Sequence, residues 1–283
     1  MNTTLKNSFF KLLFSVLIAP VLFSCQEDEM VSAEDSAIAD ALISDEAIAD
    51  DLFEDMDEIS MQAAVYTTNG RVSSEGGIAD LSCVSRSVER GGDLSSAVTL
   101  SFSGECKGPK GRIRTGTLLI DRSIDLNTST YTVNATFQDF FVNGHQLEGT
   151  RTLVYSVDDD QLILVNVTLT DGRVTLADGS VITRSGSFTR TIDRKNGQIT
   201  VTGSAKGTNR NGVAYVSEIT TPLVFQQSCA ADGIYMPAQG GKSISRTGRN
   251  DLEINFGDGT CDKNVTITSE GENRIVKITF TGK

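Results

Sequence analysis

The sequence predicts an all-β protein: an antiparallel meander of stacked hairpins, preceded by a short acidic helical stalk. From Tyr66 onward, short runs rich in Thr, Val, Ile and Phe alternate with polar residues, a pattern typical of half-buried strands. Gly and Asx dipeptides separate these runs and favour tight hairpin turns. The spacing of the runs, about 8 to 20 residues, leaves no room for the crossover helices that parallel strands need.

Residues 1–24 predict a lipoprotein signal peptide. Lys6 and Lys11 accompany an apolar run, Leu12 to Phe23, which has the length of a secretory segment and is too short to cross a bilayer. Leu22-Phe23-Ser24-Cys25 resembles the lipobox of bacterial lipoproteins, which implies that Cys25 is acylated, palmitate included, and becomes the N-terminus. Several acyl chains anchor a protein stably to a membrane. The alternative is an ordinary cleaved signal peptide in which Cys25 is incidental.

An acidic tetrapeptide follows the proposed anchor. Gln26-Glu27-Asp28-Glu29 is similar to the export signal by which Bacteroidetes lipoproteins reach the outer face of the outer membrane. The resemblance implies a lipid-anchored, cell-surface protein. The alternative is an outer-membrane lipoprotein that faces the periplasm.

The negative charge of the chain is concentrated near its start. Residues 26–63 carry fourteen acids and no Lys or Arg, whereas residues 64–283 carry 23 basic and 23 acidic residues. Because like charges repel, we interpret residues 25–63 as an acidic linker with one or two short helices, and a partner-binding helix is the alternative. Ser36 stands in a sequence, Asp35-Ser36-Ala37, that matches a short O-glycosylation motif. Residues 64–283 then form the β domain, which we expect to fold alone.

Within the β domain, period-two alternation marks several strands and dipeptides mark the turns. The clearest strands are Val98–Phe102, Thr117–Ile120, Tyr131–Phe137 and Leu162–Leu169. The expected turns are Asn143-Gly144, Asp171-Gly172, Asp178-Gly179, Asn196-Gly197 and Asn211-Gly212. Gly144, Gly179 and Gly212 lie 35 and 33 residues apart, a spacing that corresponds to two hairpins per unit. An extended twisted sheet and a sandwich both fit this pattern.

Four cysteines remain after Cys25. An even number in an oxidising compartment favours disulfides. The pairing of sequence neighbours is Cys83–Cys106 with Cys229–Cys261, and two other pairings stay open. A zinc site is the functional alternative, although the chain has no CxxC pair and a single His.

The C-terminal region carries a family resemblance. Phe256-Gly-Asp-Gly-Thr-Cys-Asp262, followed by two alternating runs, looks like the C-terminal hairpin of an uncharacterised family of Bacteroidetes outer-membrane and surface lipoproteins. Blocks at 108–120 and 140–149 look similar to further parts of that family. The resemblance implies a fold and a location, and no reaction.

The search for chemistry yields no catalytic motif. Net charge −12 excludes a nucleic-acid binder, because no basic excess exists to neutralise phosphates. His145 follows an Asn-Gly turn, where a surface role is the usual one, and no nucleophile elbow, phosphate loop or zinc motif occurs. Carboxylates that suit a calcium ion are the remaining metal candidates. These weak candidates are Asp158, Asp159, Asp160, Asp258 and Asp262.

Two functions from different classes follow from the sequence. The first is a surface-anchored protein with a non-catalytic binding or structural role, without a cofactor, whose partners are the membrane and an extracellular protein or glycan. The second is a surface glycan hydrolase that uses paired carboxylates, which needs no recognisable motif. A concave cleft that holds two close, buried acids favours the hydrolase.

Overall fold

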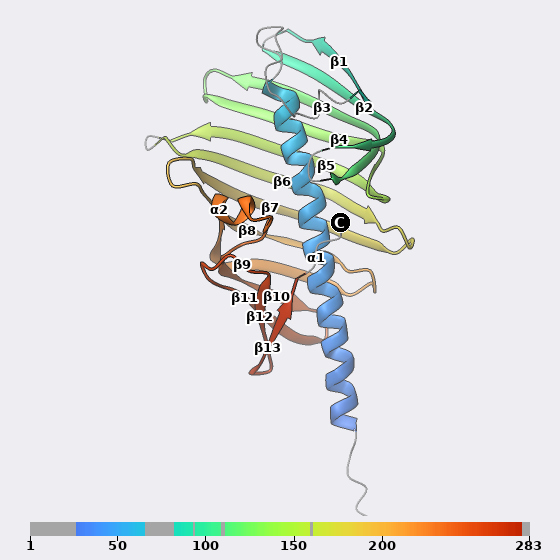
Figure 1. Cartoon of the computed structure of the whole chain (residues 1–283), viewed down its shortest axis with the longest axis vertical. Coiled ribbons are helices and arrows are strands. Elements are labelled where there is room, and N and C mark those ends of the chain that lie inside the picture. The colour runs from blue at the N-terminus through green and yellow to red at the C-terminus, as the bar shows by residue number, and fades with distance from the viewer. Residues whose placement is uncertain (1–26, 66–81, 93, 109–110, 159–160, 279–283) are drawn as a thin grey trace, which may run out of the picture.

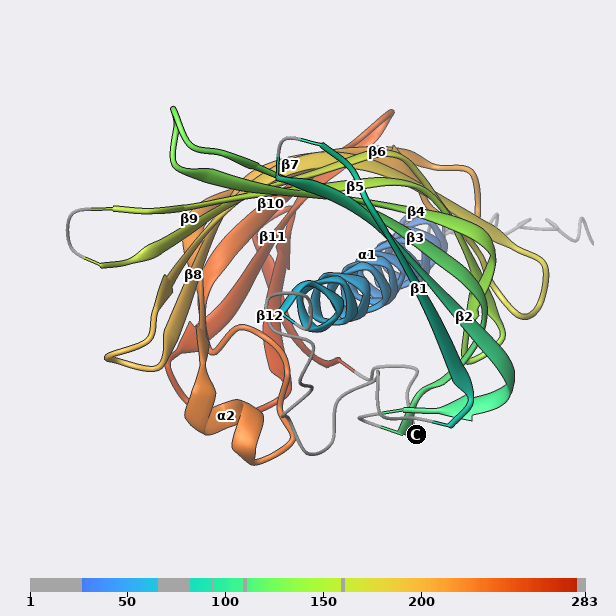
Figure 2. The same cartoon turned by 90° about the horizontal axis from the view of Figure 1, so that it is seen from above.

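A single antiparallel sheet of 13 strands wraps around one long helix (Figures 1 and 2). The computed structural model describes residues 27–65, 82–92, 94–108, 111–158 and 161–278. Each strand pairs with its neighbours in sequence, from β1 to β13. The strands are β1 (Val84–Arg90), β2 (Ser95–Lys107), β3 (Ile113–Asp125), β4 (Thr130–Val142), β5 (His145–Val157), β6 (Ile163–Thr175), β7 (Val181–Asp193), β8 (Gln198–Thr208), β9 (Ala214–Gln226), β10 (Gln239–Arg246), β11 (Arg249–Asp258), β12 (Asn264–Ser269) and β13 (Glu272–Lys277).

This topology confirms the predicted all-β meander and decides between its two forms. The described strands make one continuous sheet, in which β1 and β13 are the edges, so the sandwich is not formed. Gly144, Gly179 and Gly212 lie in the β4–β5, β6–β7 and β8–β9 turns. They therefore recur at the same end of the sheet, once every two hairpins.

One of the predicted turns does not form. Asp171-Gly172 lies inside β6, at a shift in the register with β5 and β7. Asp171 adopts a left-handed φ of 50°, as the dipeptide predicts, but it forms a bulge that bends the strand. Gly149 on β5 faces this bulge, where a Cβ would lie 2.9 Å from the Asp171 carbonyl oxygen. The local conformation was predictable, whereas its place in a strand depends on pairing at both edges.

The acidic segment forms one helix, α1 (Glu27–Val65), and it is not a spacer. Figure 1 shows its first turns beyond the sheet and the rest across the concave face of the strands. Most apolar residues of the later turns are buried. These residues are Ala39, Leu42, Ile43, Ile48, Ala49, Leu52, Phe53, Met56 and Ile59. The interpretation of residues 25–63 as a solvated linker is corrected here, because the curved sheet supplies a surface on which the helix buries these side chains.

Two hydrophobic clusters follow the helix from Ala39 to Ile59. Ala39, Leu42 and Ile43 pack with residues of the C-terminal strands, such as Ile244 and Ile267. The part from Ile48 to Ile59 packs with residues of β2 to β7. The helix therefore contributes to both hydrophobic clusters, and residues 64–283 do not bury their core by themselves.

Two disulfides join neighbouring segments in the pairing of sequence neighbours: Cys83–Cys106 and Cys229–Cys261. The first ties the segment before β1 to β2. The second ties α2 (Gln227–Ala231) to the loop after β11. With two such bonds the four thiols are all consumed.

The disulfides lead to a testable expectation. Each closes a loop of 23 or 32 residues in sequence separation, and a loop of that size stabilises by about 3 kcal/mol in the chain-entropy model. Mass spectrometry of the denatured, non-reduced soluble chain, with Cys25 removed, is expected to detect no alkylated cysteine. Cys229→Ser with Cys261→Ser is expected to lower the free energy of unfolding by about that amount. Alkylation of four thiols in the untreated protein would contradict the pairing.

Candidate functional site

The acids of α1 meet basic side chains that project from the concave face of the sheet. The ion pairs that α1 makes with the rest of the described chain include Asp40–Arg274, Asp45–Arg210, Glu46–Arg184, Glu46–Lys242, Asp50–Arg184, Asp50–Lys242, Asp51–Arg112, Glu54–Arg190, Asp55–Arg112, Asp55–Arg114, Asp57–Arg151 and Asp57–Arg190. The negative charges of α1, which would repel one another in an isolated segment, are thus compensated by basic side chains of the sheet. Eight acids of α1 have such a partner.

The most buried of these pairs is Asp55 with Arg114. The Arg114 side chain is 1% exposed, and its Nε donates to Asp55 Oδ2 at 2.9 Å while Nη2 donates to Asp55 Oδ1 at 2.6 Å. This two-pronged geometry is the strong form of an arginine–carboxylate contact. Arg112 adds a contact from its Nη1 to the same carboxylate at 3.0 Å.

Asp57 bridges two arginines on neighbouring parts of the sheet. Its carboxylate accepts from Arg151 Nη2 and Arg190 Nη1, each at 2.8 Å. Burial alone would raise the pKa of Asp57, but the charges of Arg151 and Arg190 outweigh it and hold that pKa below its ordinary value. Asp57 therefore stays ionised within the interior.

A second group of charges surrounds Glu46 and Asp50. Arg184 contacts both carboxylates, and Lys242 Nζ lies 3.4 Å from Glu46 Oε2 and 3.1 Å from Asp50 Oδ2. Ser217 Oγ donates to Glu46 Oε2 at 2.8 Å. Burial would raise the pKa of Asp50, and the charges of Arg184 and Lys242 more than offset this and lower it.

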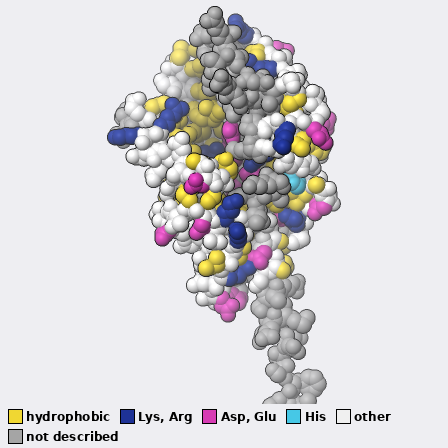
Figure 3. Space-filling view, in the orientation of Figure 1, with side chains coloured by type: hydrophobic (Ala, Val, Ile, Leu, Met, Phe, Trp, Pro, Cys, Tyr) yellow, Lys and Arg dark blue, Asp and Glu magenta, His cyan; other side chains and the backbone are white. Residues whose placement is uncertain are grey.

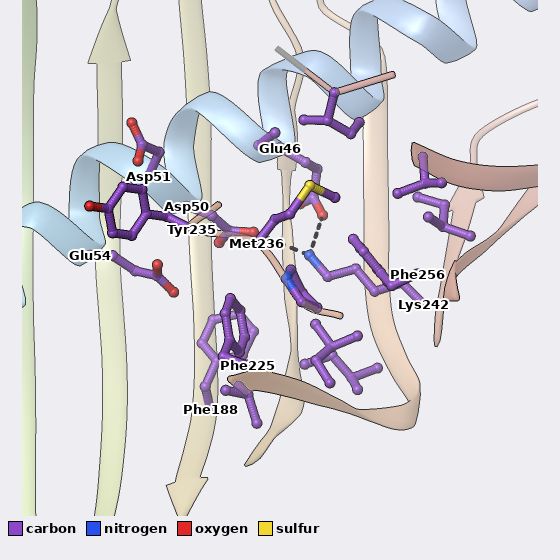
Figure 4. Close-up of a pocket in the computed structure, with 18 of the residues that line it drawn as sticks. Glu46, Asp50, Asp51, Glu54, Phe188, Phe225, Tyr235, Met236, Lys242 and Phe256 are labelled. Carbon is purple, nitrogen blue, oxygen red and sulfur yellow. Dashed lines mark hydrogen bonds and ion pairs between the residues drawn. The ribbon is translucent and has the colours of Figure 1, made fainter. Parts of the chain in front are cut away.

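A cavity lies between this acidic helix and the strands β7 to β11 (Figure 4). It has an inner part of about 90 Å³ and an outer part of about 480 Å³, and the outer part is in the size range of small-molecule sites. Seven residues line both parts: Asp51, Glu54, Arg190, Val201, Phe225, Tyr235 and Met236. Tyr235 and Met236 belong to the loop between α2 and β10, so this loop lies where the two parts meet.

The wall of the cavity on the sheet side is mostly apolar but includes Arg151, Arg190 and Lys242, and the wall on the helix side is acidic. Inward-facing residues of the strands form the apolar wall: Phe188, Val201, Ile219, Leu223, Phe225, Ile254 and Phe256. Asp50, Asp51 and Glu54 form the opposite wall, and Figure 4 shows them around Tyr235. Figure 3 shows hydrophobic side chains next to Lys and Arg on the face of the molecule that Figure 1 presents.

Glu54 differs electrostatically from the neighbouring acids. Its side chain is 42% exposed, and Arg190 Nη2 lies 3.4 Å from its Oε1. Burial raises the pKa of Glu54, and the charges of Asp50 and Asp57 raise it further, against the opposing charge of Arg190. Glu54 therefore holds a less compensated negative charge than Asp50 or Asp57.

The residues that the sequence singled out do not gather at this cavity. His145 begins β5, where its Nδ1 accepts a hydrogen bond from Ala177 N at 3.2 Å, and burial lowers its pKa. Asp158 accepts from Leu162 N in the β5–β6 turn. Asp258 and Asp262 each accept from a backbone N–H two residues on, those of Thr260 and Asn264. Each of these calcium candidates thus stabilises its own turn, and among the described residues no group of three His, Cys, Asp or Glu side chains could hold a metal ion.

The other sequence-based candidates concern the N-terminal region. Residues 1–24, Cys25 and Gln26 lie outside the described residues, as do Asp159 and Asp160. Glu27, Asp28 and Glu29 form the start of α1. Ser36 is exposed on α1, so the glycosylation motif is accessible.

Sequence reasoning missed the cavity and the ion pairs around it, although a signal for them existed. Arg151 stands two residues before Leu153, and Arg190 stands between Phe188 and Ile192 at the same spacing. Because side chains two apart share a face of a strand, these arginines point with the apolar residues toward the interior. Buried arginines require acidic partners, and α1 is the acid-rich segment of the chain.

Comparison of the chain with models of known protein families, with curated proteins and with solved structures finds no match. Neither helix in the described part of the chain combines the length and the hydropathy needed to cross a membrane.

Proposed function

We propose that the chain is a surface-anchored lipoprotein with a non-catalytic binding role, and that the cavity between α1 and the sheet takes an apolar ligand. The supporting observation is a concave space whose sheet side carries aromatic and aliphatic side chains beside Arg151, Arg190 and Lys242. Apolar surface exposed in such a space gains free energy when a ligand removes it from water. The acids on the other side are held by arginine and lysine, which favours a structural use of their charge.

Ligand binding tests this proposal directly. Ala47 lies on α1 and lines the inner part of the cavity, whereas Ala37 is exposed on the same helix. Ala47→Phe is expected to weaken binding of the neutral fluorescent probe N-phenylnaphthylamine about tenfold or more, because the new ring occupies the space. Ala37→Phe makes the same change outside the cavity and is expected to leave the affinity unchanged. The proposal is wrong if the wild-type protein does not bind the probe.

The anchoring part of the proposal rests on Leu22-Phe23-Ser24-Cys25. Cells that express the wild-type chain and are fed a clickable fatty acid are expected to label the protein, and the Cys25→Ala variant is expected to stay unlabelled. Replacing Glu27, Asp28 and Glu29 by Ala is expected to abolish surface antibody labelling at unchanged total amount. Equal fatty-acid label in Cys25→Ala would contradict the anchor, and persistent surface labelling would contradict the export signal.

A glycan hydrolase is the second candidate, and one observation favours it. Glu54 and Asp50 lie one helical turn apart on the cavity wall, with the pKa of Glu54 raised and that of Asp50 lowered. Opposite shifts of this kind suit an acid and a nucleophile in glycoside hydrolysis. Arg184 and Lys242 already pair with Asp50, however, and the facing wall is mostly apolar, which favours binding. Turnover of aryl glycosides that disappears in Glu54→Gln would establish the hydrolase instead.

A further inference from the structure

Glu54 is poorly neutralised in comparison with the acids around it. Its contact with Arg190 is 3.4 Å long, and the other end of that guanidinium lies 2.8 Å from Asp57. By contrast, Asp55 accepts three hydrogen bonds of under 3 Å from Arg114. Glu54 also keeps 42% of its side chain exposed, at the point where both parts of the cavity meet. Its carboxylate is therefore available to a ligand.

The surrounding charges make this position favourable for a cation. Asp50 and Asp57 lie one helical turn on either side of Glu54 and both raise its pKa. Arg190 and Arg151 oppose them but are engaged by Asp57. A positive group placed beside Glu54 would relieve the repulsion among these carboxylates, whereas an anion would add to it.

Aromatic rings complete the surroundings of Glu54. Figure 4 shows Tyr235 next to Asp51 and Glu54, with Phe225 on the strand side of the cavity. Rings of this kind attract organic cations through their electron-rich faces. Phe188 already receives the Arg184 guanidinium 5.6 Å from its ring centre, so cation–ring contact occurs elsewhere in the same interior. Beyond the rings, Val201 and Leu223 continue the apolar wall.

We propose that the cavity selects an amphiphile with an organic ammonium head group, which lies between Glu54 and Tyr235 while its hydrocarbon chain runs along Phe225 and Val201. The inference rests on the proposed binding function and names the chemical class of the ligand. It follows from the less compensated carboxylate, the adjacent rings and the apolar wall, which together match the two ends of such a molecule.

Three probes with the same chain test the inference: dodecyltrimethylammonium, dodecanoate and dodecanol, each titrated below its micelle concentration into the soluble chain and followed by calorimetry. The ammonium probe is expected to bind about tenfold more tightly than dodecanol, and dodecanoate more weakly than dodecanol. Glu54→Gln is expected to remove the preference for the cation, so that dodecyltrimethylammonium and dodecanol bind with similar affinity. Tyr235→Leu, which leaves the ion pairs intact, is expected to reduce the same preference.

Glu148→Gln serves as the matched control, because Glu148 is an exposed acid that pairs with exposed Arg173 on the sheet. It is expected to keep the full preference for the cation. Equal affinity for all three probes, a preference for dodecanoate, or a cation preference that survives Glu54→Gln would overturn the inference and leave the binding function standing. Failure of all three probes to bind would instead refute the proposed function itself.

Discussion

A chain that begins at Ala64 is expected to lose the cooperative thermal transition of the full body. Removing α1 uncovers the concave face of the sheet and leaves Arg114, Arg151 and Arg184 without their carboxylates. Each large apolar side chain of the helix stabilises by about 1.5–3 kcal/mol through burial. Seven such side chains are buried: Leu42, Ile43, Ile48, Leu52, Phe53, Met56 and Ile59. Their sum exceeds about 10 kcal/mol, which is comparable to the whole stability of an ordinary domain, about 5–15 kcal/mol.

The measurement compares thermal melts, followed by circular dichroism, of soluble chains that begin at Gln26 and at Ala64. The longer chain is expected to melt in one transition and the shorter one to aggregate or to show none. Adding a peptide of residues 36–61 to the shorter chain is expected to restore the transition in part, because the contacts of α1 need no covalent link to the sheet. A full cooperative melt of the shorter chain without the peptide would support the linker interpretation that the structure corrects.

Asp55→Leu is expected to lower the free energy of unfolding by about 3–5 kcal/mol, the usual cost of removing one partner of a buried ion pair. The reason is Arg114, whose side chain is 1% exposed and which cannot shed its proton. Without Asp55 its guanidinium stays buried and charged with no carboxylate of its own. Arg112 also loses one contact but keeps Asp51.

Urea unfolding followed by circular dichroism measures this effect, and two further variants interpret it. Asp55→Leu combined with Arg114→Met is expected to regain most of the loss, because a pair of apolar side chains can replace a buried ion pair at small cost. Glu148→Gln removes an exposed pair and is expected to cost less than about 1 kcal/mol. A loss as small as this in Asp55→Leu would mean that the Asp55–Arg114 contact is not desolvated in solution.

Local patterns in the sequence were sufficient to predict the strands and most of the turns. In β6, Val165, Val167 and Leu169 are buried while Asn166 and Thr168 are exposed, as period-two alternation requires. Asn143-Gly144 and Asn196-Gly197 form the turns expected of them, since glycine adopts a positive φ without steric cost. Asp171-Gly172 also adopts the positive φ that the dipeptide predicts at Asp171, but it forms a bulge instead of a turn. The reason is that a register shift inside a strand is set by both neighbouring strands.

Local patterns in the sequence could not predict the candidate site. Glu54 is separated from Phe225 and Tyr235 by more than 170 residues in sequence, and no motif links it to them. The charge pattern of the sequence placed Glu54 in a charged spacer. Nothing in the sequence distinguished Tyr235 and Phe225 from other residues of the β domain. Only the path of α1 across the sheet places the three around one cavity.

The sequence by itself determined the antiparallel meander and the helical character of the acidic segment, because strand alternation, turn preference and helical spacing are properties of near neighbours in the chain. The tertiary structure decided whether the sheet closes on a second sheet or on a helix, and whether the acids of the helix face water or basic side chains of the sheet. Those outcomes depend on burial and on charge pairing between segments about 60 to 200 residues apart. Such pairs stabilise the protein only when the sheet has curved around α1 and brought the charges together.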